Sequence, residues 1–155
     1  MSRKKNDKKS KASEVEILSA VPAALSKTGI PLYAETVSAG FPSPAESYRE
    51  GELDLNELLV KNPPATFFVR VAGDSMTGAG IFPGDILVVD RSIEPSDKSV
   101  VVAALDGEFL VKRLRLKEHR VTLEPENRKY APIEITEQSD FKVWGVVTAV
   151  VHKLQ

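Results

Sequence analysis

The second half of the chain is a series of short β-branched and apolar segments separated by turn residues, and this pattern constrains the fold most strongly. The pair Asp106-Gly107 stands between two such segments and is a strong signal for a two-residue hairpin turn. Six strands are expected, at residues 66–71, 86–90, 99–105, 108–116, 120–124 and 141–151. The sequence therefore predicts a mostly β protein with a compact, antiparallel, barrel-like domain.

The first sixty residues lack this pattern. Residues 1–12 are expected to be disordered, and residues 13–39 to form an extended or partly helical arm that becomes ordered only against another surface. Residues 54–60 predict a short capped helix, which the prolines that follow it end. We therefore divide the chain into a basic arm, residues 1–39, and a β-domain, residues 40–155.

Charge is unevenly spread between these two parts. Residues 1–40 contain seven Lys or Arg and four Asp or Glu, whereas residues 41–155 contain 14 and 18. A mildly acidic body gives no reason to expect direct DNA binding by the folded domain. The basic run from Arg3 to Lys11 is either a solvated tail or a contact for an anionic partner.

Composition excludes several kinds of chemistry. Cysteine is absent, which excludes disulfide scaffolds, thiolate zinc sites and cysteine nucleophiles. His119 and His152 are too few for a histidine metal cluster, so neither a metal nor another cofactor is expected. The longest uninterrupted apolar run, Val100 to Leu105, is far shorter than the roughly 18 residues of a membrane span. These features favour a cytoplasmic protein without a membrane anchor.

Lys112 interrupts an otherwise apolar strand face. Alternation places it on the side of the second hairpin strand whose other members are Leu110, Leu114 and Leu116. One interpretation is a lysine at the rim of the sheet, with its stem on apolar surface and its amine in water. The other is a lysine in apolar surroundings, where desolvation penalises the ammonium and a neutral amine can act as a general base.

Ser75 is the candidate nucleophile for such a base. It lies in a turn after the expected strand 66–71, with Gly73 and Gly78 on either side. Such a turn can expose a hydroxyl and direct backbone N–H groups at a developing oxyanion. The alternative is a polar turn in which Asp74 and Ser75 only satisfy the backbone. Serine–lysine pairs are a known form of nucleophile plus base, and this chain carries both on neighbouring β-elements.

Three motifs, taken together and in order, resemble the LexA/UmuD family of self-cleaving serine peptidases (S24-like). Gly73-Asp74-Ser75-Met76 resembles the nucleophile box, and the segment from Asp106 to Lys112 resembles the one that carries the catalytic lysine. Ala39-Gly40-Phe41-Pro42-Ser43-Pro44 resembles the cleavage site, a small residue followed by glycine. Ser75 and Lys112 are 37 positions apart, as the family leads one to expect. The resemblance runs from about residue 40 to residue 151.

Within this family the chain is more similar to the UmuD branch than to the LexA branch. A winged helix-turn-helix domain needs on the order of 70 residues. Only 39 residues precede Gly40, and they show no helix-turn-helix pattern. The segments at residues 41–45 and 54–56 also resemble UmuD. The Lys-rich start departs from the family pattern, so the details of the arm are not carried over.

The resemblance implies a reaction and a set of partners. Ser75 would be the nucleophile, Lys112 the general base, and the bond between Ala39 and Gly40 the one that is cut. A RecA filament on single-stranded DNA would stimulate this cleavage. The shortened homodimer would then join a UmuC-like Y-family DNA polymerase as a subunit of an error-prone translesion polymerase in the SOS response.

Other interpretations of the sequence stay open at this point. A type I signal peptidase shares the serine–lysine chemistry but needs a membrane anchor. A LexA-like peptidase fragment, or a regulator of the phage repressor type, would share the fold and the cleavage. A non-catalytic binding module could also keep the fold while the serine and the lysine are incidental.

Overall fold

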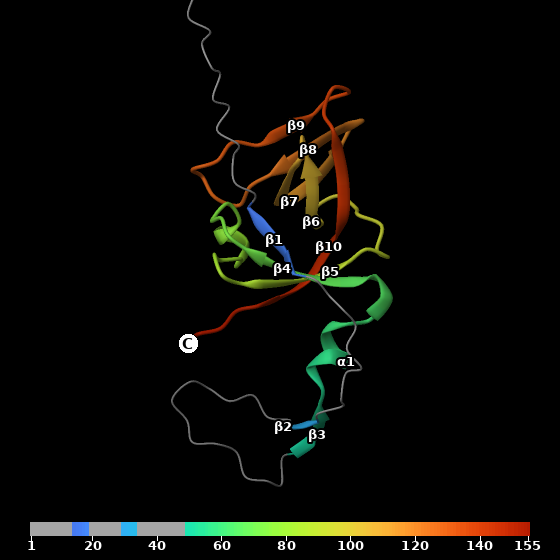
Figure 1. Cartoon of the computed structure of the whole chain (residues 1–155), viewed down its shortest axis with the longest axis vertical. Helices are drawn as coiled ribbons and strands as arrows, with labels where there is room; N and C mark the ends of the chain where they lie inside the picture. The colour runs from blue at the N-terminus through green and yellow to red at the C-terminus, as the bar shows by residue number, and fades with distance from the viewer. Residues whose placement is uncertain (1–13, 19–28, 34–48) are drawn as a thin grey trace, which may run out of the picture.

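A strongly curved antiparallel sheet forms the body of the protein. The computed structural model describes residues 14–18, 29–33 and 49–155. In this part of the chain the sheet has eight strands in the order β1-β4-β5-β10-β6-β7-β8-β9. Figure 1 shows them curled into a half-barrel. The strands are β1 Val15–Leu18, β4 Thr66–Val71, β5 Ile86–Asp90, β6 Val100–Leu105, β7 Glu108–Lys117, β8 Arg120–Glu124, β9 Ile133–Ile135 and β10 Phe141–Val151.

The expected fold class is confirmed. Strands β4, β5, β8 and β10 have the predicted bounds, and β6 and β7 each differ from them by one residue at one end. The sequence did not predict β9, whose three residues Ile-Glu-Ile are too few to show an alternating pattern. Every pair of neighbouring strands in this sheet is antiparallel.

Further elements in the described part of the chain lie outside the eight-stranded sheet. Strands β2 (Ile30–Tyr33) and β3 (Arg49–Leu53) pair in a second, two-stranded sheet. The predicted short helix is α1 (Leu55–Leu59), and the Asp54 side chain caps it by accepting a hydrogen bond from the Asn56 N–H at 2.8 Å. Short 3₁₀ turns follow, η2 (Pro63–Ala65) and η3 (Thr77–Ala79).

The arm is extended where the structure describes it. Residues 15–18 pair with β4 along its free edge, with Val15 opposite Val71 and Leu18 opposite Phe68. This agrees with the expectation that the arm orders against another surface. The predicted disordered segment, residues 1–12, lies outside the described residues.

Two apolar clusters stabilise the curved sheet. The first joins β1, β4, β5, β6 and β7 around Met76, and the second joins β6, β7, β8 and β10 around Leu123. Strand β6 contributes to both because Val101 and Val102, on opposite faces, are completely buried. The curvature also brings β1 to β7, where the N–H of Glu14 donates to the carbonyl of Phe109 at 3.1 Å. The functional site lies at this junction.

Candidate active site

Ser75 lies in the turn that leads from β4 into η3. Two contacts fix this turn: Met76 is completely buried in the first cluster, and the Ile81 N–H donates to the Met76 carbonyl at 3.2 Å. Ser75 itself is 2% exposed. The sequence analysis expected a turn that can expose the Ser75 hydroxyl. In this structure the turn is present, but the hydroxyl is buried and faces other protein groups.

Lys112 meets Ser75 from strand β7. Its side chain is 3% exposed, beside Val101 on the neighbouring strand. The amine Nζ lies 2.8 Å from Ser75 Oγ and 3.3 Å from the carbonyl oxygen of Val111. The interpretation of Lys112 as a rim lysine with its amine in water is therefore wrong. The fold brings together the two residues that the sequence paired.

Glu14 is a third member of the site, and the sequence analysis did not find it. Its carboxylate oxygen Oε2 lies 2.5 Å from Lys112 Nζ and 3.3 Å from Ser75 Oγ. The expectation of wholly apolar surroundings for Lys112 is therefore only half right. Leu110 and Leu114 on its strand face are buried, but its amine lies in an ion pair.

A loop between β8 and β9 supports the nucleophile turn through backbone contacts. The Glu126 N–H donates to the Ser75 carbonyl at 2.8 Å, and the Gly78 N–H donates to the Glu126 carbonyl at 2.7 Å. The Asn127 side chain adds a bond of 2.8 Å from Nδ2 to the Asp74 carbonyl. These bonds hold the turn on both sides of Ser75. The sequence analysis assigned no role to this loop.

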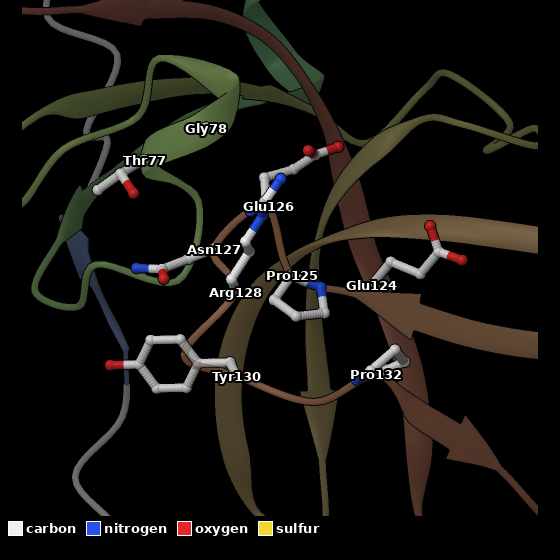
Figure 2. A pocket seen from close by; sticks show the side chains of 9 residues that line it. All are labelled: Thr77, Gly78, Glu124, Pro125, Glu126, Asn127, Arg128, Tyr130 and Pro132. Atoms are coloured by element: carbon white, nitrogen blue, oxygen red, sulfur yellow. The ribbon is translucent and has the colours of Figure 1, made fainter.

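The same loop and turn line an open pocket of about 530 Å³. Thr77 and Gly78 line it from the nucleophile turn, and Pro125, Arg128 and Pro132 line it from the loop. Figure 2 shows the Asn127 and Tyr130 side chains reaching from the loop toward the turn. Thr77 and Gly78 follow Ser75 closely in the chain, but neither Ser75 nor Lys112 lines the pocket.

Tyr130 ties the loop to the residue before the nucleophile. Its hydroxyl donates a hydrogen bond to the Asp74 carboxylate. This bond, ahead of desolvation and of the nearby negative charges, raises the pKa of Tyr130 above its ordinary value. A group whose pKa is raised by folding stabilises the fold below the ordinary range of that group. The contribution is lost as pH rises through the raised value.

We therefore expect Tyr130 to ionise later than an ordinary tyrosine. In a titration followed by ultraviolet absorbance, the phase that belongs to Tyr130 should lie above the ordinary range of a tyrosine. Tyr130→Phe should remove this late phase, and Asp74→Asn should return it to the ordinary range. A late phase that persists in Tyr130→Phe would contradict the assignment.

Two further sequence predictions concern the cleavage site and the membrane anchor. Ala39 and Gly40, the predicted cleavage site, lie outside the described residues. No helix in the described ranges is long and apolar enough to cross a membrane.

The comparison with known protein families identifies the class to which this fold and site belong. Residues 31–148 match the peptidase S24-like family, and this match covers most of the chain. The chain belongs to this family of self-cleaving serine peptidases.

Relatives that match most of the chain define the branch within that family. The chain is 49% identical to protein SamA of Salmonella typhimurium over 123 residues, which cover 79% of this chain and 85% of SamA. It is 48% identical to protein ImpA of Escherichia coli over 128 residues (79% and 83%) and to protein MucA of Escherichia coli over 120 residues (77% and 82%). A LexA repressor of Magnetococcus marinus is 40% identical over 121 residues, which cover 78% of this chain but 51% of the repressor. The chain is thus a UmuD-like SOS mutagenesis peptidase, as its motifs indicated.

Proposed function

We propose that Ser75 and Lys112 are the catalytic pair with which this protein cuts its own chain between Ala39 and Gly40. The observation that carries the proposal is the distance of 2.8 Å between Lys112 Nζ and Ser75 Oγ, with both side chains buried. A nucleophile and its base must lie within hydrogen-bond reach of each other, and this pair does. The family membership of the chain supports the same reaction.

The chemistry follows from these two groups. Lys112, as a free amine, takes the proton of Ser75 Oγ while Oγ bonds to the carbonyl carbon of Ala39. The tetrahedral intermediate then collapses: the bond from Ala39 to Gly40 breaks, and the Gly40 nitrogen receives the proton from Lys112. Residues 1–39 remain as an ester on Ser75 until water hydrolyses it. Backbone N–H groups around Asp74 and Ser75 would stabilise the oxyanion.

The proposal divides the chain at the cut. The arm, residues 1–39, is the part removed, and the 116 residues from Gly40 to Gln155 remain as the active form. Since the arm belongs to the enzyme or to its dimer partner, proximity takes the place of substrate affinity. The rate is then controlled by how often the arm reaches the site.

The cellular role extends the proposal to partners. The UmuD-like relatives support a RecA filament on single-stranded DNA as the stimulus, and a UmuC-like Y-family polymerase as the partner of the shortened homodimer. We place this role in the cytoplasm, where both partners act on DNA. We propose no direct DNA contact by the β-domain, because its charge is net negative.

Intact mass spectrometry tests the proposal. The full chain is incubated with a RecA filament whose activity is shown on a known substrate. We expect a new species with the mass of residues 40–155, in wild type and not in Ser75→Ala. Cleavage at another bond would overturn the assignment of Ala39 and Gly40. No cleavage in wild type would favour a non-catalytic binding module.

A further inference from the structure

A strand of the arm is bound at the edge of β4 beside the nucleophile turn. Glu14 is bound there by its backbone: its N–H donates to the Phe109 carbonyl at 3.1 Å, and its own carbonyl accepts from Ala72 N–H at 2.7 Å and Gly73 N–H at 3.2 Å. Strand β1 continues along the edge of β4, as Figure 1 shows. Residues 14–18 thus bind as an added strand, the way that extended peptides bind to free sheet edges.

The Glu14 side chain reaches from this strand into the catalytic pair. Its carboxylate forms an ion pair of 2.5 Å with Lys112 Nζ and lies 3.3 Å from Ser75 Oγ. In this arrangement the Lys112 amine donates to both the Glu14 carboxylate and Ser75 Oγ, and an amine that donates to Oγ does not accept the proton of Ser75. The carboxylate also takes space beside Oγ that a scissile carbonyl needs. The arrangement is therefore one that cannot cut.

We propose that residues 14–18 are a built-in inhibitory strand and that Glu14 is the latch that keeps the uncut chain inactive. This inference rests on the catalytic pair of the proposed function. The other edge of β4 is taken by β5, so a strand that delivers the scissile bond to Ser75 along β4 has only the edge that β1 occupies. Residues 14–18 and the segment with the scissile bond belong to the same arm, and they compete for this one edge of β4.

Strand β1 is held by apolar contacts but is short enough to leave the sheet edge by local opening. Val15 is buried in the first core cluster, so docking of β1 removes apolar surface from water. The strand has only four residues at the edge of the sheet, and edge segments of this length open locally without global unfolding. The rate of spontaneous cleavage is then set by how often β1 leaves the edge of β4.

Removing the carboxylate tests the latch in the full chain. Glu14→Gln keeps the size of the side chain and removes its charge. We expect the spontaneous rate of self-cleavage, measured by intact mass without RecA, to rise at least about tenfold. Glu137→Gln is the matched control, because Glu137 is exposed and lies outside both the arm and the site, and its rate should equal that of wild type.

A second variant displaces the whole strand. Val15→Asp places a charge in the core position that β1 occupies, which is unfavourable enough to expel the strand. It should also raise the spontaneous rate, while circular dichroism shows that the β-domain stays folded. An unchanged or lower rate in Glu14→Gln would overturn the proposal that Glu14 keeps the uncut chain inactive.

The failure of the latch and the failure of the proposed function give different results. If Glu14→Gln cuts at the wild-type rate while Ser75→Ala does not cut, the catalytic pair stands and the latch is wrong. If the double variant Glu14→Gln/Ser75→Ala still cuts at the rate of Glu14→Gln, Ser75 is not the nucleophile. A rise in Glu14→Gln that Ser75→Ala abolishes supports both.

Discussion

Replacement of Ser75 by alanine or of Lys112 by methionine is expected to lower the rate of self-cleavage by at least about a thousandfold, and the double variant should lose no more. The two groups act as a unit, because the proton leaves Ser75 Oγ for Lys112 Nζ across 2.8 Å. Methionine fills the space of the buried lysine stem, so the loss reports the amine. The measurement is the cleavage rate of each variant by intact mass with an active RecA filament.

Matched controls separate this loss from a loss of structure. Lys117 is an exposed lysine on the same strand, so Lys117→Met should cut at the wild-type rate. Thermal unfolding of each variant shows whether the β-domain is intact. If the double variant is much slower than either single variant, the two residues act independently and the pair is not the catalytic unit.

Much of the fold could be predicted because its signals are local. Strands β4 to β8 and β10 are short apolar or alternating segments with turn residues between them, and the turn at Asp106-Gly107 fixes the β6–β7 hairpin. Both Asp106 and Gly107 have positive φ, as this two-residue turn requires. Alternation alone also placed Lys112 on an apolar face, which led to half of the proposed catalytic pair.

The rest could not be predicted because it depends on contacts between distant residues. Glu14 lies 98 positions from Lys112, and nothing in the composition of residues 13–39 marks it as part of a site. The interpretation of Lys112 as an amine in apolar surroundings was incomplete for this reason: it considered only the neighbours on one strand. The loop at residues 125–130 matches none of the motifs from which the site was predicted, and its role rests largely on backbone bonds that leave no trace in the sequence.

Under the two proposals above, these missed contacts explain how one chain can contain both an enzyme and its substrate without cutting at once. The proposed catalytic pair, Ser75 and Lys112, is already within hydrogen-bond distance while Glu14 is bound beside it. Control would then act on access to the pair. An arm that carries both the proposed inhibitory strand and the proposed scissile bond would provide this control, since binding one segment would exclude the other.

Support of the nucleophile turn by the β8–β9 loop leads to the second large effect. Gly78→Ala is expected to destabilise the fold by about 1–3 kcal/mol and to slow self-cleavage at least about tenfold. A Cβ at this position would lie 2.6 Å from the Glu126 carbonyl oxygen, closer than real contacts allow. That carbonyl cannot move away freely, because it accepts a hydrogen bond from the Gly78 N–H at 2.7 Å. The clash must therefore shift the turn or the loop, and with them the bond of 2.8 Å from the Glu126 N–H to the Ser75 carbonyl.

Gly73→Ala is the matched control for this substitution. Gly73 lies on the other side of Ser75, and a Cβ there would meet its nearest neighbour, Glu14 Cγ, at an ordinary contact distance of 3.5 Å. Its free energy of unfolding in urea should stay within about 0.5 kcal/mol of wild type, whereas that of Gly78→Ala should fall. Equal stability of the two variants would mean that the loop yields to the added methyl group. The turn at Ser75 would then be held by the buried Met76 rather than by the loop, because Met76 is the other fixed point of the turn.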